Sequence, residues 1–178
     1  MKIYSTRHGQ TDYNKQDMIL GSTDLPLNDT GFAQAVRLAA EVEARGDIDI
    51  IICSPMLRAQ MTANAVSLRC GLEVVTDERL REWNYGAYEG KPRTAGGFAA
   101  GKHEFGVRMG GTGESLLQLS HRVYSALDDI IARYRGKNVL IVSHGGVCRV
   151  IETYFHDMTI EEFDHWFMGN CKIIEYNV

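Results

Sequence analysis

Hydrophobic residues along this chain form two patterns: short uninterrupted apolar runs, and longer stretches in which apolar residues recur every three or four positions. Uninterrupted runs are typical of strands buried on both faces, whereas the second spacing is typical of amphipathic helices. Runs of this kind predict strands at residues 49–53 and 137–143, and shorter stretches predict further strands at residues 2–6, 73–76 and 171–176. The helical spacing predicts helices at residues 28–45, 54–70, 114–134 and 144–155, with one more short helix after Thr159.

Residues typical of helix ends support several of these boundaries. Asn28 is a good N-cap, Gly46 and Gly71 stand where helices commonly end, and Thr159 with Glu162 has the sequence of a capping box. The apolar stripes predict the helix faces that pack on the sheet. These are Phe32, Ala35, Val36, Ala39 and Val42 in the first helix, Leu57, Met61, Ala65 and Leu68 in the second, and Leu116, Leu119, Val123, Leu127 and Ile130 in the third.

Buried strands alternate with amphipathic helices along the chain, and no repeat, linker or low-complexity tract interrupts the alternation. This order predicts an α/β fold, a three-layer sandwich around a mostly parallel central sheet. A chain of 178 residues can form one substantial core, so we expect residues 1–178 to be a single domain.

Three segments show neither of the two hydrophobic patterns. Residues 7–27 contain several turn formers and are expected to be a loop at the mouth of a site. Residues 80–90 mix aromatic, charged and glycine residues without a period, as functional segments often do. Residues 96–113 contain seven glycines, which predicts a mobile loop with at most short helical pieces; an ordered connector is the alternative.

Charge and composition exclude some classes of partner. Acidic residues outnumber basic ones by 23 to 19, which gives a net charge of -4 and a pI near 5.9. Such a surface does not attract nucleic acid or anionic membranes, so we expect neither as a partner. An anionic ligand would have to be captured locally. The composition leaves the oligomeric state open.

The cysteines and the N-terminus indicate an intracellular setting. No CxxC motif is present, and the six histidines do not combine with the cysteines at metal-ligand spacings, so we expect reduced thiols and no metal site. No long apolar segment or cleavage site follows Met1, so a cytoplasmic location is expected. The four cysteines are Cys53, Cys70, Cys148 and Cys171.

Reactive residues follow three of the predicted strands. Arg7 and His8 follow the predicted strand at residues 2–6, and Arg58 lies in the first helical turn after the strand at residues 49–53. His144 follows the strand at residues 137–143 and precedes the N-terminus of a predicted helix. Taken singly, each has an ordinary structural explanation, such as a buried structural histidine or a surface arginine. Because ligands bind beyond the carboxyl ends of parallel strands, together they predict a pocket for a phosphate dianion.

Five stretches together resemble the motifs of the histidine phosphatase superfamily, also called the phosphoglycerate mutase-like family, over nearly the whole chain. They are Arg7-His8-Gly9-Gln10-Thr11 with Asn14; Asp24-Leu25-Pro26-Leu27 with Gly31; Ser54-Pro55-Met56-Leu57-Arg58-Ala59 with Thr62-Ala63; Leu80-Arg81-Glu82 with Gly86 and Glu89-Gly90; and Val142-Ser143-His144-Gly145-Gly146. No catalytic position departs from the family pattern. The short glycine-rich stretch after Gly90 does depart from it, which leaves the substrate open.

The resemblance implies a role for each matched residue. His8 would attack phosphorus and become phosphohistidine, while the Gly9 carbonyl holds the other ring N–H. Glu82 would be the general acid that protonates the leaving oxygen and then activates water, and a neighbouring phosphate dianion favours its protonated form. The groups that would bind the phosphoryl oxygens are Arg7, Arg58, His144, the Gly145 N–H and Asn14.

Residues that would contact the rest of the substrate are less sharply indicated. The resemblance places Gly21, Ser22 and Thr23 in a substrate loop. Three cations of the glycine-rich stretch, Lys102, His103 and Arg108, could contact an acidic leaving group, although a solvated loop is the simpler interpretation. Trp83 and Tyr85 are either walls of the pocket or core residues.

The leading hypothesis is therefore a metal-independent phosphomonoesterase that acts on a small phosphate ester and needs no cofactor. Two alternatives share the fold: a phosphoglycerate mutase, and a non-catalytic sensor of phosphate ligands. The presence of His8, Glu82 and His144 argues against the sensor, since binding alone needs neither a nucleophile nor an acid.

Overall fold

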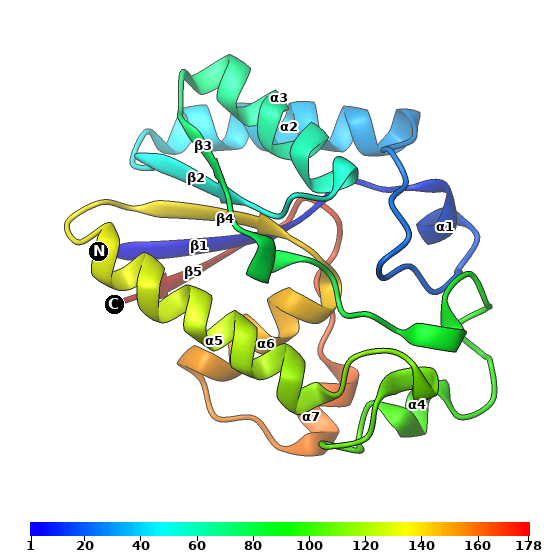
Figure 1. The fold of residues 1–178 in the computed structure, drawn as a ribbon. Helices are drawn as coiled ribbons and strands as arrows, with labels where there is room; N and C mark the ends of the chain where they lie inside the picture. Colours follow the sequence, from blue (N-terminus) through cyan, green and yellow to red (C-terminus); the bar gives the residue numbers. More distant parts are fainter.

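The computed structural model describes residues 1–178 and has a five-stranded sheet at its centre, in the order β3-β2-β4-β1-β5 (Figure 1). Neighbouring strands are parallel except β5, which runs antiparallel to β1 at one edge. The strands are β1 (Lys2–Arg7), β2 (Ile50–Cys53), β3 (Val74–Thr76), β4 (Val139–Ser143) and β5 (Ile173–Asn177). The mostly parallel sheet expected from the apolar runs is thus confirmed.

Helices cover both faces of this sheet. In Figure 1, α2 (Asp29–Arg45) and α3 (Leu57–Cys70) lie above it, and α5 (Leu116–Arg133) and α6 (Gly145–Phe155) lie below it, with α7 (Ile160–His165) beside them. Each layer has its own cluster of buried apolar residues against the sheet. This is the predicted three-layer sandwich. None of the helices is both long and apolar enough to cross a lipid bilayer.

Several local predictions are confirmed. Asn28 caps α2 by accepting the Gly31 N–H, Gly46 ends that helix at a φ of 65°, and Thr159 and Glu162 form a capping box on α7. The predicted inner stripe of α5 is buried over its whole length. Cys53, Cys148 and Cys171 are buried, Cys70 is half-buried, and all four are free thiols.

The predicted inner faces of α2 and α3 are wrong in part. Leu57 and Leu68 are 44% and 88% exposed, and Phe32 and Val36 on α2 also face outward. On α3, the buried residues are Arg58, Ala59, Thr62, Ala63 and Val66. Small side chains let the helix lie close to the sheet, and turning this face inward is what brings Arg58 to the end of β2.

The segments between these elements contain short helices that the sequence pattern did not predict individually. They are α1 (Asp12–Lys15), η1 (Glu78–Leu80), η2 (Gly86–Tyr88), α4 (Phe98–Gly101) and η3 (Met109–Gly111). Thr11 and Asn14 form a capping box on α1, within the stretch expected to be a loop. In the glycine-rich stretch, Phe98 and Met109 are buried in the main apolar cluster. These two side chains anchor the segment to the core.

The strand order brings distant parts of the sequence together. β1 pairs with β4 so that Arg7 lies opposite Ser143, and the His8 N–H donates to the Ser143 carbonyl at 2.9 Å. The residues that follow these two strands, His8 and His144, are therefore neighbours at the carboxyl edge of the sheet. Their ring centroids lie 5.1 Å apart.

Candidate active site

His8 lies at the carboxyl end of β1 with its ring fully buried and its orientation fixed by the backbone. Its Nδ1 lies 2.7 Å from the Gly9 carbonyl oxygen, which can only accept, so Nδ1 carries the proton and Nε2 carries the lone pair. Burial, and then the charges of Arg58 and Arg7, hold the pKa of His8 well below its usual value. The ring is therefore neutral at physiological pH, as a nucleophile must be.

Arg58 lies beside Nε2 of this ring. Its Nε donates to His8 Nε2 at 3.2 Å, and its two terminal nitrogens donate to the carbonyls of Thr23 and Gly21 at 2.9 and 2.8 Å. The side chain is completely buried, and an arginine has such burial only when most of its donors are satisfied. These bonds fix the planar guanidinium against the His8 ring.

The loop that holds Arg58 is in turn held by Glu89. The Glu89 carboxylate accepts the backbone N–H groups of Gly21 and Ser22 at 3.0 and 2.8 Å and the Thr23 hydroxyl at 3.0 Å. A side chain on Gly21 would meet the Glu89 carboxylate and the backbone at van der Waals overlap, so only glycine fits. Glu89 belongs to the same motif as Glu82, but its position in the sequence does not indicate this role.

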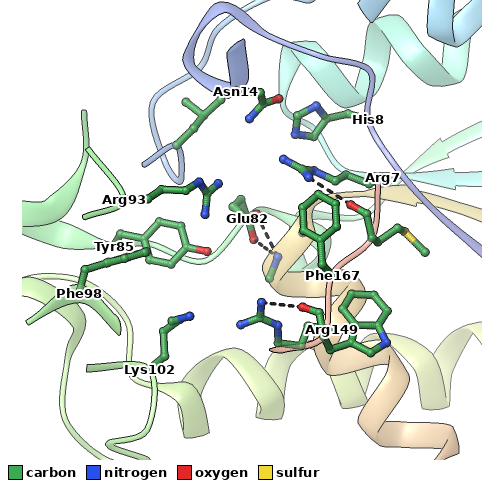
Figure 2. A pocket seen from close by; sticks show the side chains of 15 residues that line it. Arg7, His8, Asn14, Glu82, Tyr85, Arg93, Phe98, Lys102, Arg149 and Phe167 are labelled. Carbon is green, nitrogen blue, oxygen red and sulfur yellow. Dashed lines mark hydrogen bonds between the residues drawn. The ribbon is translucent and has the colours of Figure 1, made fainter. Parts of the chain in front are cut away.

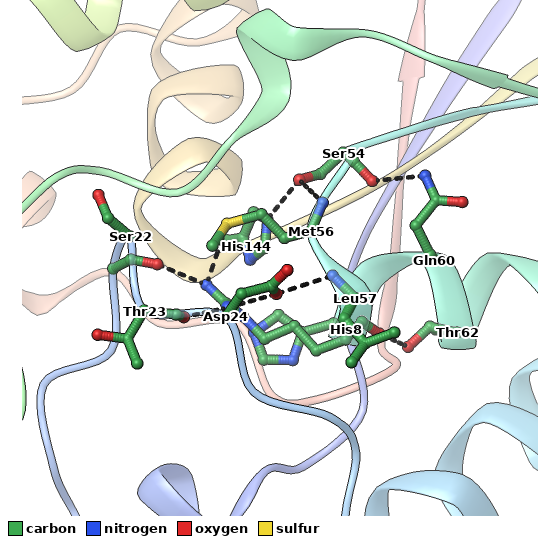
Figure 3. A network of polar contacts seen from close by, with 12 residues as sticks. His8, Ser22, Thr23, Asp24, Ser54, Met56, Leu57, Gln60, Thr62 and His144 are labelled. Atoms are coloured by element: carbon green, nitrogen blue, oxygen red, sulfur yellow. Dashed lines mark hydrogen bonds and ion pairs between the residues drawn. The ribbon is translucent and has the colours of Figure 1, made fainter.

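His144 caps the β4 to α6 junction and is fully buried beside His8. Its Nε2 lies 2.7 Å from the Ser54 hydroxyl, whereas its Nδ1 has no hydrogen-bond partner (Figure 3). Burial and the nearby Arg58 charge hold its pKa well below the usual value. An unpaired ring nitrogen in such a place is costly unless a ligand completes it.

Arg7 extends toward the cavity from the end of β1. One terminal nitrogen donates to the Met168 carbonyl at 3.1 Å, and the guanidinium lies 5.6 Å from the centre of the Phe167 ring. Its Nε is buried and has no partner. This N–H donor is available to an anion.

Glu82 faces Arg7 across the start of α6. Its carboxylate accepts the Gly146 N–H at 3.1 and 3.2 Å and the Trp83 N–H at 2.8 Å, and the residue is 7% exposed. A side chain on Gly146 would approach the Glu82 Oε1 to 2.7 Å, so glycine is required for this contact. The helix N-terminus thereby fixes the carboxyl group at the edge of the cavity.

A cavity of about 60 Å³ lies between these groups (Figure 2). Arg7, His8, Asn14, Glu82 and Gly145 line it, so five of the sequence-predicted site residues meet at one point. Asn14 is oriented by the capping box of α1. Arg58 and His144 do not line the cavity; Arg58 contacts His8 at Nε2, and the His144 ring adjoins the His8 ring. Tyr85 forms a wall, whereas Trp83 is a core residue with its Nε1 bonded to the Glu114 carbonyl.

The predicted substrate loop is not part of this cavity. None of Gly21, Ser22 and Thr23 lines it, because their polar groups are directed to Glu89 and Arg58. Ser22 instead lines a second, wider groove of about 410 Å³, together with Arg108 and the other side of Glu82.

Four further side chains of the cavity were missed or misjudged from the sequence: Arg93, Lys102, Arg149 and Phe167. Lys102 was expected to be solvated, but it is bonded to Asp164 at 2.6 Å and points into the cavity. His103 lies 3.4 Å from the same carboxylate and remains half exposed. Arg149 follows His144 by a little over one helical turn, which is the single signal that could have identified it.

Comparison with known proteins supports the family resemblance seen in the sequence motifs. The profile of the histidine phosphatase superfamily (branch 1) matches residues 3–178. A putative phosphoserine phosphatase 2 of Hydrogenobacter thermophilus is 34% identical over 99% of this chain and 89% of its own length. A probable phosphoglycerate mutase of Yersinia pestis is 37% identical over 82% of this chain and 70% of its own.

Solved structures match closely as well. A mycobacterial glucosyl-3-phosphoglycerate phosphatase in complex with VO3 superposes with a TM-score of 0.86 at 27% identity, covering 98% of this chain and 91% of that one. A phosphoserine phosphatase of Entamoeba histolytica in complex with 3-phosphoglyceric acid superposes at 0.84 and 28% identity, covering 98% and 89%. The profile match over nearly its whole length shows that this chain belongs to the histidine phosphatase superfamily, branch 1, the phosphoglycerate mutase-like enzymes.

Proposed function

We propose that the protein is a metal-independent phosphomonoesterase that hydrolyses a small phosphorylated metabolite through a phosphohistidine on His8. The observation that carries the proposal is the state of this ring: a proton held on Nδ1 by the Gly9 carbonyl, and an unprotonated Nε2 that accepts a hydrogen bond from Arg58 Nε. A sensor of phosphate would need the arginines but not a histidine in this tautomer.

In the first step, the Nε2 lone pair of His8 forms a bond to phosphorus while the bond from phosphorus to the ester oxygen breaks. Arg7 and Arg58 surround the phosphoryl oxygens, and Arg58 Nε exchanges its bond to Nε2 for one to a phosphoryl oxygen. His144 and the Gly145 N–H at the start of α6 complete the set. Because these donors are already in place, they stabilise the transition state with little reorganisation.

Glu82 supplies the proton in this step and recovers it in the next. Its carboxyl proton passes to the departing ester oxygen, which leaves as an alcohol. The resulting carboxylate then takes a proton from water, whose oxygen attacks phosphorus. The bond from phosphorus to Nε2 breaks, its electrons return to the ring, and inorganic phosphate leaves.

Rapid-quench labelling with a phosphorylated substrate tests the proposal. The wild-type protein is expected to give an acid-labile phosphoprotein that His8→Ala lacks, whereas His121→Ala, a change at an exposed position on α5, should label like wild type. Because side chains supply the positive charge, a chelator should leave the rate unchanged. Labelling of His8→Ala, or activity lost in chelator and restored by a divalent ion, would refute the mechanism.

A phosphoglycerate mutase is the competing function, because several of the similar proteins are named probable phosphoglycerate mutases. The first step is the same in both, and the two functions differ in what accepts the phosphoryl group: water in the phosphatase, and a second hydroxyl of the bound acid in the mutase.

A further inference from the structure

The segment that carries Glu82 has no regular structure of its own. After η1 ends at Leu80, residues 81–85 belong to no helix or strand, and Arg81 is extended, with φ of -57° and ψ of 150°. Backbone carbonyls in such a segment must find partners other than those of a helix or a sheet. The groups that supply these partners therefore determine how firmly the segment is held.

One side chain of α5 supplies most of the partners. Arg122 donates from Nη1 to the carbonyls of Arg79 and Arg81 at 2.5 and 2.7 Å, and from Nη2 to the Glu82 carbonyl at 3.1 Å. An arginine suits this place because its planar guanidinium carries five N–H donors in fixed directions. The backbone on both sides of the Arg81–Glu82 peptide bond is thus bonded to a single guanidinium.

Glu114 fixes this guanidinium in turn. Its carboxylate accepts from Arg122 Nε and Nη2 at 2.7 and 2.9 Å, and the two side chains are only 17% and 20% exposed. The Glu114 backbone holds the same segment, because its N–H donates to the Asn84 carbonyl at 2.9 Å and its carbonyl accepts the Trp83 indole N–H at 2.7 Å. Since the carboxylate neutralises the guanidinium, the pair adds no net charge beside Glu82.

Both members of the Arg122–Glu114 pair are positioned by α5. Glu114 immediately precedes Ser115, which caps this helix, and Arg122 lies in its second turn. Leu119 and Val123, on the inner stripe of the same turns, are fully buried. The pair is therefore attached to a helix that is packed firmly on the sheet.

The backbone and the side chain of Glu82 are held by different helices. Arg122 of α5 binds its carbonyl, whereas the Gly146 N–H of α6 binds its carboxylate. Loss of the first contact would free the backbone while the second contact remained. A displacement of about 1 Å at a group that transfers a proton can cost roughly 100-fold in rate.

We propose that Arg122 is a positioning residue for the general acid: its bonds to the carbonyls around Glu82 hold the carboxyl group in reach of the leaving oxygen. This assignment rests on the proposed phosphatase function and adds a residue to its proton-transfer step. Arg122 does not line the cavity that contains His8, and borders the second groove instead. It acts on the reaction only through Glu82.

Leaving groups of different basicity separate positioning from folding. Arg122→Met should slow phosphorylation of His8 by an alkyl ester about 100-fold, but phosphorylation by p-nitrophenyl phosphate less than about 3-fold, since nitrophenolate leaves without a proton. Arg122→Lys keeps the charge but loses the planar donors, and should show most of the same selective loss. Arg81→Met is the matched control, because it removes a cation of the same groove that is paired only with exposed Glu78. It should leave both rates unchanged.

Rapid quench measures the phosphorylation rate in each variant, with whichever of 3-phosphoglycerate and glycerol 3-phosphate labels the wild type faster as the alkyl ester. Urea unfolding shows that each variant is folded under the assay conditions. If Arg122→Met does not fold, Arg122→Lys provides the same comparison.

A double variant identifies the residue through which Arg122 acts. With Glu82→Gln already present, the change at Arg122 should slow phosphorylation by the alkyl ester less than about 3-fold further, because no carboxyl proton remains to be positioned. If the two losses multiply instead, Arg122 acts independently of Glu82 and the proposal is wrong.

The single variants can overturn the proposal as well. Equal slowing with both substrates would assign Arg122 to the stability of the fold alone, and a wild-type rate in Arg122→Lys would show that the planar donors are not needed. The proposed function fails separately, if wild-type His8 is phosphorylated by neither alkyl ester nor p-nitrophenyl phosphate.

Discussion

A histidine can attack phosphorus only if one ring nitrogen carries no proton, and at position 8 the backbone of the next residue ensures this. The Gly9 carbonyl fixes the tautomer, and burial keeps the ring neutral. Gly9 can lie there because it packs against the backbone of Gly31, where an added side chain would collide. The reactivity of one residue thus depends on a contact between two glycines.

The role of Glu82 depends on how strongly the leaving group needs a proton. Glu82→Gln should slow phosphorylation of His8 by 3-phosphoglycerate by roughly 10² to 10⁴, because an alkoxide leaves poorly. Phosphorylation by p-nitrophenyl phosphate should slow much less, since nitrophenolate leaves unaided. Rapid quench isolates this step. Glu78→Gln, an exposed carboxylate nearby, serves as the control, and equal slowing with both substrates would remove Glu82 from the acid role.

The buried histidines also predict how stability depends on pH. His8 and His144 have a folded-state pKa well below 6.5, so below that pH the unfolded chain binds protons that the folded chain does not. These two histidines should therefore not affect the free energy of unfolding well above pH 6.5. Below pH 6.5 the free energy of unfolding should fall as the pH falls, with a slope approaching about 1.4 kcal/mol per pH unit for each histidine.

Urea unfolding at a series of pH values measures this slope. His144→Gln should make the slope shallower between pH 6.5 and about pH 5, whereas His121→Gln, at an exposed position, should not change it. An unchanged slope in His144→Gln would mean that the folded protein protonates His144 as easily as the unfolded chain does.

The site residues that could be predicted from the sequence are those that follow a predicted strand. Arg7, His8, Arg58 and His144 each follow a recognisable strand, and parallel strands end at the same edge of a sheet. Glu89 could not be assigned in the same way, because its partners are backbone N–H groups of a loop 66 to 68 residues away. Nothing local distinguishes such a carboxylate from a solvated one.

At the scale of elements, α3 shows why apolar spacing can mislead. Both of its faces carry apolar residues at helical spacing, and the larger ones, such as Leu57 and Leu68, lie on the outside. The face turned inward is the one with small residues and Arg58. Packing distance and the position of the arginine decided the orientation, and neither can be read from hydrophobicity alone.

A pair of substitutions on α3 checks this orientation. Leu68→Ser should change the free energy of unfolding by less than about 0.5 kcal/mol, because the side chain is 88% exposed. Val66→Ala, two residues earlier and fully buried, should cost roughly 1–3 kcal/mol through lost contacts and a cavity. Chemical denaturation measures both. A larger loss from the change at Leu68 would show that the helix turns its other face inward.

The glycine-rich segment was predicted only in outline. Short helical pieces were expected and are present as α4 and η3, but the composition could not show that Phe98 and Met109 enter the core. Isolated apolar residues among glycines have no period. Consequently Lys102, which this anchoring carries into the cavity, was expected in solvent.

At the scale of the whole molecule, the openness of the site decides between hydrolysis and phosphoryl transfer. Phe167 beside Arg7 is 75% exposed, and the Arg93 side chain is 41% exposed, so water can reach the cavity. We expect phosphate release from the preferred ester to exceed interconversion of 2- and 3-phosphoglycerate, even with bisphosphoglycerate added to prime His8.

Phosphorus NMR can follow free phosphate and the isomerised phosphoglycerate in one reaction. Phosphoglycerate isomers accumulating faster than free phosphate appears from any ester in a panel would show the mutase function instead. The His8→Ala variant should do neither, which controls for contaminating enzymes.

The overall fold was predictable because the central strands β2 and β4 are apolar runs and because amphipathic helices alternate with the strands. The order of strands was not. No pattern within β1 indicates that it pairs with β4 and β5 rather than with β2, which follows it in the chain.

This strand order has a consequence for biosynthesis. β1 is made first, yet both of its partners, Val139–Ser143 and Ile173–Asn177, lie near the other end of the chain. While the ribosome is adding the intervening residues, β1 has two unpaired edges, and the nucleophile lacks its neighbour His144. Contacts of such long sequence separation form slowly. Until the ribosome has added β4 and β5, the β1 segment therefore has neither of its partners in the sheet, and an unpaired strand edge can pair with other chains.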